Sequence, residues 1–405
     1  MLSSRGFASA EFRWGAARCL RAIAIREKGL DDATCERLEG WLIQWKTPEP
    51  VHDSEERRQQ TSTHAEAPTD SLLWGHGRSM VLPGGNYPLL EALTLGYLLR
   101  QPMNADQWLG ALERHLLRHE DPAVWEALTD NLRFLVNAER GRAVAFLKQL
   151  LEAQPSILAS DRSVLLIAHI HGWLPGEMFA PIADGWIMGG WPRGPQAAGE
   201  VATLRLCQRP EDLDARELVE RFISGSDYDT AVAARLRLGV AHTLVQAWGQ
   251  PPLRALSTPL ILRLLSLADG SVAVALRLVF AKTDPLPTDD YTRLLLQALL
   301  AHPEIAFARE PTFLVDRLKD LLREGWEPEL IHGVVATVLE RAGMKLSDMR
   351  TAWPVHAGDL VEIALTLHRM PETRSRGLEL FEKLMHLDAY GIEDRLSILD
   401  RRPFR

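Results

Sequence analysis

The chain has 405 residues, of which 46% are hydrophobic and 25% are charged, and its formal net charge is −8. These proportions are those of a soluble protein that buries a core, either as one extended array or as two to three domains. The acidic excess argues against binding to duplex DNA, because that binding requires a basic surface to neutralise the phosphates.

The cysteines and the apolar runs indicate a cytoplasmic protein. The cysteines are odd in number, namely Cys19, Cys35 and Cys207, and no CxxC or Cys/His spacing typical of a zinc site occurs. The first residues lack the long apolar core of a signal peptide, and no uncharged apolar stretch reaches about 18 residues. We therefore expect a cytoplasmic chain that does not span a membrane.

Residues 1–46 predict a helical hairpin, which would be a partial repeat. In its first helix, apolar residues recur at the spacing of one face: Phe12, Ala16, Leu20 and Ile23. Gly29 ends this helix, and Asp31-Asp32 suits the positive end of the next one. Because the hairpin lacks a polar repeat on its outer side, either another polypeptide covers it or the chain is a piece of a longer protein.

Residues 47–71 break the helical pattern. They contain acidic residues, Gln, Ser, Thr and Pro, but hardly any large apolar side chain. Such a segment buries too little surface to offset its chain entropy. The composition therefore predicts an acidic disordered linker that separates the first hairpin from the rest of the chain.

The segment 72–88 is rich in Gly and Pro and predicts a structured but irregular loop. Beyond it, apolar residues keep a helical rhythm almost without interruption. This rhythm predicts helices over 88–100, 105–119, 122–137, 139–153, 161–172, 176–184, 195–208, 213–223, 227–248, 252–267, 271–282, 288–301, 312–323, 328–342, 359–369, 373–387 and 391–400. Asp359-Leu-Val-Glu362 has the spacing of a capping box, and Gly391 suits a left-handed helix stop.

Paired helices with short connections recur roughly every 35–45 residues, which is the period of HEAT and armadillo repeats. No string repeats cleanly, and no segment alternates with period two for long enough to suggest a sheet. The sequence therefore predicts an all-α fold. We expect residues 72–405 to form an irregular HEAT/armadillo-like helical-repeat solenoid.

No phosphate-binding loop is encoded. Gly75-His-Gly77 begins like the G-x-G-x-x-G fingerprint, but Met80 stands where the third glycine is needed and no strand precedes the motif. The pattern G-x-x-x-x-G-K-[ST] is also absent. We therefore expect no nucleotide, no other cofactor and no small-molecule substrate.

Histidines, serines and acidic pairs do not assemble into a recognisable metal or catalytic site. His115 and His119 have the i, i+4 spacing of zinc ligands, but the glutamate of the zincin motif is missing, so two surface histidines are the preferred interpretation. His169 and His171 lie about 200° apart around a helix, so they cannot share an ion, and a core histidine is preferred. No G-x-S-x-G elbow occurs. We predict no metal site, no catalytic residue and no enzymatic activity.

Twelve tryptophans are more than the composition requires. They either fill space beside tight turns or anchor a binding face, since Trp is enriched at interface hot spots. The two loops richest in Trp and Gly are 72–88 and 185–194. From these loops we take the following candidate partner-binding residues: Trp74, His76, Arg78, Tyr87, Trp186 and Trp191.

Four strings share a family resemblance: Leu72-Leu-Trp-Gly-His-Gly77, Leu82-Pro-Gly-Gly-Asn-Tyr-Pro-Leu89, Gly194-Pro-Gln-Ala-Ala-Gly-Glu200, and Gly377-Leu-Glu-Leu-Phe-Glu-Lys-Leu384 through Asp400-Arg-Arg402. On these strings, the chain from Ser71 onward resembles the C-terminal HEAT-like helical-repeat region of large bacterial STAND-type NTPases of anti-phage defence. In that family the nucleotide-binding core and the effector lie upstream of the repeats. The resemblance therefore implies a role in sensing or scaffolding, and it carries no catalytic residue to this chain.

Three functional hypotheses follow. The first is a non-catalytic sensor or scaffold module of a bacterial defence system, which binds a protein such as an NTPase, an effector polypeptide or a phage protein. The second is a stand-alone adaptor that joins subunits of another cytoplasmic complex. The third is a HEAT-repeat nucleic-acid enzyme, such as an alkylated-base glycosylase, which would need a groove rich in Lys and Arg around an acidic residue. The acidic balance of the chain argues against the third hypothesis.

Overall fold

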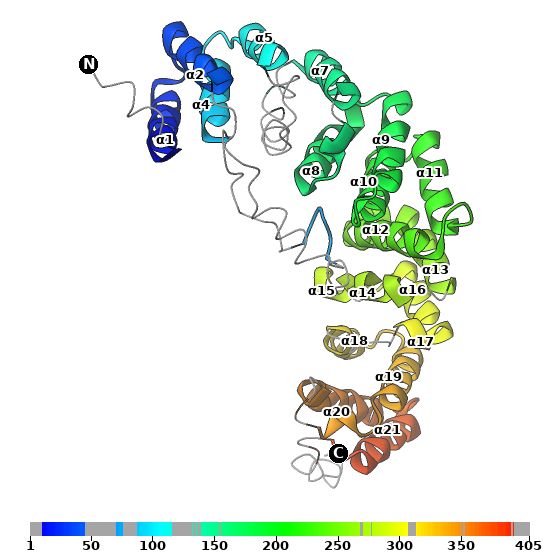
Figure 1. Ribbon diagram of the computed structural model, residues 1–405. Helices are drawn as coiled ribbons and strands as arrows, with labels where there is room; N and C mark the ends of the chain where they lie inside the picture. Colours follow the sequence, from blue (N-terminus) through cyan, green and yellow to red (C-terminus); the bar gives the residue numbers. More distant parts are fainter. Residues whose placement is uncertain are drawn as a thin grey trace. The chain divides into compact units, whose positions relative to one another are not determined.

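The computed structural model describes residues 10–44, 70–75, 87–115, 132, 135, 139–153, 155–267, 270–276, 278–306, 313–348, 350, 353–389 and 392 (Figure 1). Across these residues all regular structure is helical, and none of them lies in a strand, so the predicted all-α class is confirmed. The chain divides into two compact units, Met1–Ala215 and Arg216–Arg405.

The first unit begins with two helices that pack on the next one along the chain. Its elements are α1 (Ala10–Glu27), α2 (Asp32–Gln44), α4 (Tyr87–Leu98), α5 (Ala105–His115), α7 (Arg140–Ala153), η2 (Pro155–Leu158), α8 (Asp161–Ile170), η3 (His171–Trp173), α9 (Gly176–Met188) and α10 (Gly194–Gln208). Helix α11 (Leu213–Ser224) contains the boundary between the two units.

Helices α1 and α2 pack against α4, so the first hairpin does not stand apart as the sequence analysis expected. The connection between α1 and α2 touches α4 directly, because the amide of Leu30 donates to the carbonyl of Gly96 over 3.0 Å. A Cβ on Gly96 would lie 3.0 Å from the Cys35 sulfur, which is tighter than an ordinary contact, so any larger residue here would require its neighbours to shift.

The face of α1 that packs on α4 differs from the predicted one. Ala17 and Ala24 are fully buried, whereas Phe12 and Ile23 are each 38% exposed. The buried positions of α1 therefore include small side chains, whereas two of its large apolar side chains remain partly exposed.

Helix α10 is buried along most of its length and packs against α8, α9 and η3. Its buried positions include polar residues as well as apolar ones: Gln196, Glu200, Thr203 and Arg205 are at most 4% exposed. A helix that is buried on most sides must pair such groups internally, because they have no access to water.

The second unit continues with helices that contact their near neighbours in the chain. Its elements are α12 (Thr230–Trp248), η4 (Pro251–Leu253), α13 (Arg254–Ser266), α14 (Gly270–Leu276), α15 (Leu278–Lys282), α16 (Asp290–Ala301), α17 (Pro303–Ala306), α18 (Leu314–Arg323), α19 (Pro328–Ala342), η5 (Gly343–Leu346), α20 (Trp353–Arg369) and α21 (Arg374–His386).

Two series of contacts run through this second unit. In one series α13 packs on α16, α16 on α19 and α19 on α21. In the other, α12 packs on α14 and α15, α15 on α18 and α18 on α20. The series are also joined to each other, by α12 with α13, α18 with α19 and α20 with α21.

Most predicted helices occur near their predicted positions, with clear differences at the end of α9, which reaches Met188, and at the start of α20. Helix α19 covers the predicted residues 328–342. Helix α20 begins at Trp353, whereas the sequence analysis placed its start at the apparent capping box of Asp359. The early start has a packing reason, because Trp353 and Ala357 are buried and Asp359 instead pairs with Lys319 of α18. Gly391 and the helix predicted over 391–400 lie outside the described residues.

Candidate functional site

The segment 70–75 forms a single helical turn that caps itself. The amide of Gly75 donates to the carbonyl of Ser71 over 2.9 Å. The Ser71 hydroxyl oxygen accepts from the amides of Leu73 and Trp74, at 3.2 and 3.1 Å. Serine is suited to this N-cap role because its short side chain reaches the free amides of the first turn.

This turn is bound by Glu200 of α10, which is fully buried. One carboxylate oxygen accepts from the Ser71 hydroxyl and the Leu73 amide, both at 2.9 Å. The other accepts from the Leu72 amide at 3.0 Å and from the Gln196 side-chain amide at 2.9 Å. All four partners donate to this side chain, and these hydrogen bonds offset the cost of burying it.

Two further side chains of the α10 end hold the residue before the turn. The carbonyl oxygen of Asp70 accepts from Arg193 and from Gln196, both over 2.8 Å. Arg193 also lies 3.7 Å from the Asp70 carboxylate and 3.5 Å from that of Asp161, at the start of α8. We call residues 70–75 together with Arg193, Gln196 and Glu200 the clasp.

The start of α10 is fixed by the end of α9. A Cβ on Gly194 would lie 2.0 Å from the backbone oxygen of Trp186, so this close approach requires glycine. Gly190, in the turn between the two helices, has a φ of +71°. Together these glycines place the first turn of α10 where the side chains of Arg193 and Gln196 bind the carbonyl oxygen of Asp70.

The clasp unites two of the strings that the sequence analysis singled out, 72–77 and 194–200. Sequence reasoning did not identify Gln196 and Glu200 as partners of the first string. A signal was present in the sequence, because a polar pair at i, i+4 among Gly, Ala and Val residues of one helix calls for a buried partner. The partner itself could not be read from local sequence, since it lies far away in the chain.

The predicted partner-binding residues are in different situations. Trp74 sits on the clasped turn and Trp191 in the turn after α9, and both side chains are half-buried. The prediction for Trp186 is wrong, because its side chain is only 1% exposed and its ring nitrogen donates to the Leu158 carbonyl over 2.9 Å.

Residues 185–188 belong to helix α9, so the predicted loop 185–194 is in part helical. Trp186 therefore fills space between elements, as the alternative interpretation of the tryptophans held. His76 and Arg78 lie outside the described residues, and Tyr87 begins α4 with a side chain that is not described.

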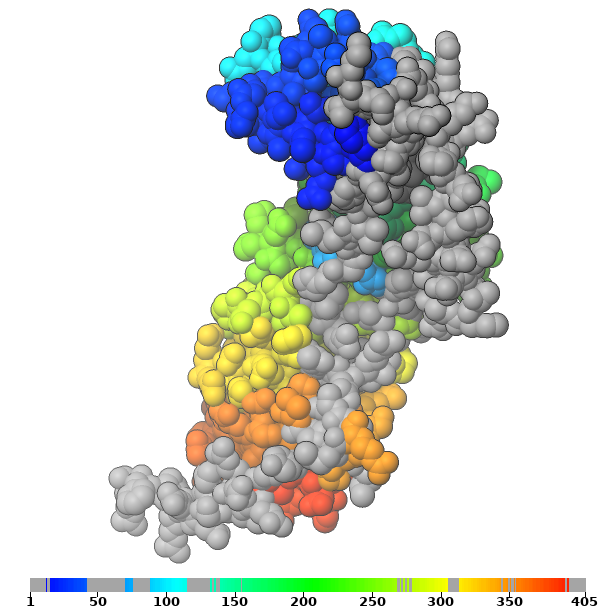
Figure 2. Space-filling model, turned by 60° about the vertical axis from the view of Figure 1, so that its left-hand side comes forward, coloured from blue at the N-terminus to red at the C-terminus, as the bar shows by residue number. Residues whose placement is uncertain are grey.

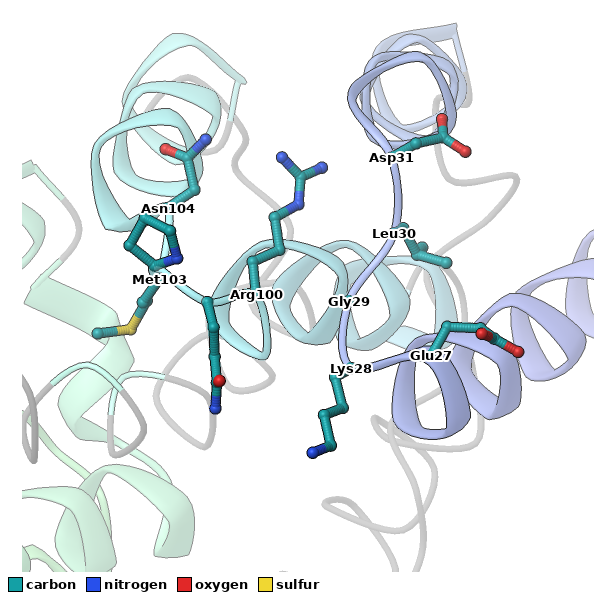
Figure 3. Close-up of a pocket in the computed structure, with 10 residues that line it drawn as sticks. Glu27, Lys28, Gly29, Leu30, Asp31, Arg100, Met103 and Asn104 are labelled. Atoms are coloured by element: carbon teal, nitrogen blue, oxygen red, sulfur yellow. The ribbon is translucent and has the colours of Figure 1, made fainter.

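A pocket of about 720 Å³ lies where the α1–α2 connection faces the α4–α5 connection (Figure 3). Its charged groups do not converge, because the side chains of Lys28 and Arg100 point in opposite directions in Figure 3. Arg100 is engaged by Asp32 and by the carbonyl of Gly96, which accepts over 3.1 Å. The pocket therefore lacks the convergent polar set that defines a substrate site.

Two ionisable side chains that contact Arg100, those of Cys35 and Tyr97, are in their neutral forms near neutral pH. Burial raises the pKa of the Cys35 thiol to about 11 and that of the Tyr97 hydroxyl to about 12. Neither side chain supplies a thiolate or a phenolate near neutral pH, because desolvation disfavours the charged form. The Arg100 guanidinium lies 3.2 Å from the Cys35 sulfur and lowers the pKa of the thiol, but burial raises that pKa by more.

The histidines do not form a metal centre in the described part of the chain, where no group of three or more His, Cys, Asp or Glu side chains could hold an ion. His171 is 1% exposed, and its Nδ1 lies 2.6 Å from the Ala168 carbonyl. Burial lowers its pKa, which favours the neutral ring. His169 is exposed and lies edge-on to Trp173. His119 lies outside the described residues, and the side chain of His115 is not described.

Among the described helices, none is both long and apolar enough to cross a membrane. Comparisons of the chain with protein-family models, with curated proteins and with solved structures found no match.

Proposed function

We propose that this chain is a non-catalytic helical-repeat module of the HEAT-like solenoid type, which binds a protein partner as a sensor or scaffold. The observation that carries the proposal is the pair of contact series in the second unit. Each helix packs on its predecessor and its successor in the same series, and the two series are joined by paired helices. Such nearest-neighbour packing is the organisation of repeat proteins, whose extended surfaces serve to bind macromolecules.

A recurrent polar arrangement supports the repeat interpretation. In the first unit, the Arg205 guanidinium donates to Asp212 over 2.7 Å, and the same carboxylate accepts from the Ala215 amide in the first turn of α11. In the second unit, Arg254 donates to Asp289 over 2.9 Å, and Asp289 caps α16 through the Thr292 amide.

Both arginines also bind the backbone carbonyls of a preceding helix end. Arg205 donates to the carbonyls of His171 and Leu174, and Arg254 donates to that of Trp248. In each unit, an arginine and an aspartate thus join one helix end to the capped start of another helix. Recurrence of this kind is expected when one supersecondary unit is used repeatedly.

The biological setting of the proposal is bacterial anti-phage defence, and it rests on the resemblance of the four strings to the repeat region of STAND-type NTPases. The second candidate function, an adaptor within another cytoplasmic complex, uses the same surface chemistry. The two differ in the partner. In a defence system the partner would be an NTPase, an effector or a phage protein, whereas an adaptor would bind two subunits of a different assembly.

The test is to co-purify the tagged full chain with the products of its neighbouring genes, and to measure binding of any purified partner by calorimetry. We expect a stoichiometric complex that Trp191→Ala weakens while the unfolding temperature is unchanged, since Trp191 is only half-buried. Leu213→Ser is the matched control, because Leu213 is 75% exposed and lies at the far end of the α9–α10 pair. The proposal would be overturned if the two substitutions weaken partner binding equally. It would also be overturned if the chain binds no protein and instead converts a small molecule.

A further inference from the structure

Three basic side chains surround the short helix η3 in the first unit. The guanidinium carbon of Arg140, at the start of α7, lies 4.0 Å from the centre of the Trp173 ring. His169 lies edge-on to the same ring, with 6.0 Å between the two ring centres. Arg209 follows α10, and its Nε would lie 3.9 Å from a Cβ on Gly172. We call Arg140, His169, Arg209 and Trp173 the η3 basic cluster.

The turn that carries Trp173 is fixed to α10. Arg205 donates to the carbonyl oxygens of His171 and Leu174, on either side of the ring, over 2.7 and 2.8 Å. His171 is 1% exposed, so the turn is anchored in the core while Trp173 itself stays half-buried. Surface groups displayed on such a rigid support lose little conformational entropy when they bind a ligand.

The basic side chains of the cluster have no carboxylate of their own. In the described part of the chain, none of the three forms an ion pair. Glu139, which precedes the cluster's first arginine, accepts instead from Arg142 over 2.8 Å. Asp212 accepts from Arg205 over 2.7 Å and also caps α11. Because like charges repel and these carboxylates are engaged, an anion supplied from outside would be attracted here.

Arg140 is held in a form suited to bind such an anion. Stacking on Trp173 fixes the plane of its guanidinium but uses none of its N–H donors. A planar fork of free donors matches the two oxygens of a carboxylate. The first turn of α7, which Arg140 opens, carries no acidic residue, so the partial positive charge of the helix start adds to the attraction.

The cluster fits protein carboxylates better than a nucleic-acid strand. Arg140 covers one face of the Trp173 ring, so this face is not available as a stacking platform for bases. The chain has a formal net charge of −8, which opposes the approach of a strand with many phosphates. A short acidic peptide carries fewer charges and can place one carboxylate on each arginine.

We propose that the η3 basic cluster is a contact surface for an acidic segment of a protein partner, whose carboxylates bind Arg140 and Arg209. The inference rests on the proposed function and deepens it, because it names the chemistry by which the partner is recognised.

The experiment titrates a fluorescein-labelled peptide of alternating Asp and Glu with the full chain and follows its anisotropy. We expect saturable binding that weakens when salt is raised, because the charges are exposed. The double variant Arg140→Gln with Arg209→Gln should lower the affinity at least about tenfold, since it removes two charge-assisted contacts. Absence of saturable binding at low salt would overturn the proposal.

Arg26→Gln is the matched control. Helices α1 and α2, drawn in blue, form part of the face shown in Figure 2, and the Arg26 side chain near the end of α1 is 76% exposed. Because Arg26 already pairs with Glu27 over 2.7 Å, its loss should change the affinity less than about twofold. Equal losses in the control and in the double variant would mean unspecific attraction and would overturn the proposal.

A milder variant and a second probe decide the matter if the double variant does not fold. Arg140→Lys keeps the charge but not the planar fork, so the affinity should fall about threefold. Unchanged affinity would show that no carboxylate is bound by the fork, against the proposal. A single-stranded oligonucleotide of equal charge should bind more weakly than the peptide, and tighter binding that Arg140→Lys weakens would replace the acidic segment by a nucleic acid.

Failure of this inference differs from failure of the proposed function. If a partner found by co-purification binds the double variant as tightly as the unaltered chain, the cluster is not its contact, although the chain still binds a protein. If the peptide binds through the cluster but the chain has no protein partner and converts a small molecule, the proposed function fails while the carboxylate site remains.

Discussion

The clasp of the first unit and the ion pairs of the second unit differ in sequence separation and in exposure to solvent. The clasp joins Glu200 to residues 127 to 129 positions earlier in the chain, inside the protein. Between α18 and α20, Lys319 pairs with Asp359 and Arg323 with Glu362, about 40 positions apart and partly in solvent. Removing one partner of the buried clasp is therefore expected to lower the free energy of unfolding more than removing one partner of these ion pairs.

The largest effect is expected at the clasp. Glu200→Gln replaces one acceptor oxygen by an amide that faces backbone donors, so we expect the free energy of unfolding to fall by about 3–5 kcal/mol. Denaturant titration followed by circular dichroism measures the change. Glu152→Gln on α7 is the matched control, because Glu152 is exposed and should alter stability by less than about 0.5 kcal/mol. If both substitutions have equal effects, the clasp is no stronger than a surface contact.

A pH titration extends the comparison to a second buried group of the first unit. Burial lowers the pKa of His171 in the folded chain below its ordinary value of 6.5. As the pH falls through 6.5, the unfolded chain binds a proton at this ring and the folded chain does not, so stability falls on acidification. The slope contributed by one such group is at most about 1.4 kcal/mol per pH unit.

Unfolding free energies measured between pH 7.5 and pH 5 test this sign. His171→Gln should flatten part of the slope, because it removes this ring. An increase of the slope in the His171 variant would show that the folded chain, not the unfolded one, takes up the proton.

A smaller effect is expected for the partly buried ion pair between Lys319 and Asp359 in the second unit. A double-mutant cycle of Lys319→Met and Asp359→Asn should give a coupling energy of about 0.5–1 kcal/mol after allowance for solvent screening. The coupling should weaken as salt is raised, since these side chains are partly in solvent. A coupling as large as the effect of Glu200→Gln would remove the contrast between the two regions.

Cleavage of the chain between residues 47 and 71 should have the smallest effect on the folded state. Limited proteolysis is predicted to cut within this stretch and to leave a fragment that begins near Ser71. Because α1 and α2 pack on α4, we expect the released hairpin to co-elute with that fragment in gel filtration. Separation of the two pieces under native conditions would show that the hairpin is an independent domain after all.

Local patterns predicted the helices well and their long-range partners poorly. The bounds of α19 follow from apolar spacing and a leading proline, which are local signals. Asp359 had the spacing of a cap, yet α20 continues upstream because Trp353 and Ala357 find a buried environment. Tertiary packing overrides a capping signal where upstream residues can be buried.

Sequence reasoning identified only part of the candidate site. The segments that contain Trp74 and Trp191 were singled out by their Gly and Trp content, and both side chains are half-buried. Trp186 follows a glycine as Trp191 does, but Gly185 lies inside α9 and packs close to Leu158. The identity of a Gly-Trp pair does not tell a turn from a tightly packed helix. Glu200 needed the structure, because its partners are distant in sequence.

The anchoring of residues 70–75 has a consequence for how the chain can vary in length. Helices α2 and α4 pack together, and residues 70–75, which come between them in the chain, are bound to α10, so two chain closures are made here instead of one. The entropy of closing a loop grows only with the logarithm of its length, and doubling the length costs about 0.6 kcal/mol. Insertions or deletions before Asp70 should therefore be tolerated as long as the turn itself keeps its register on α10.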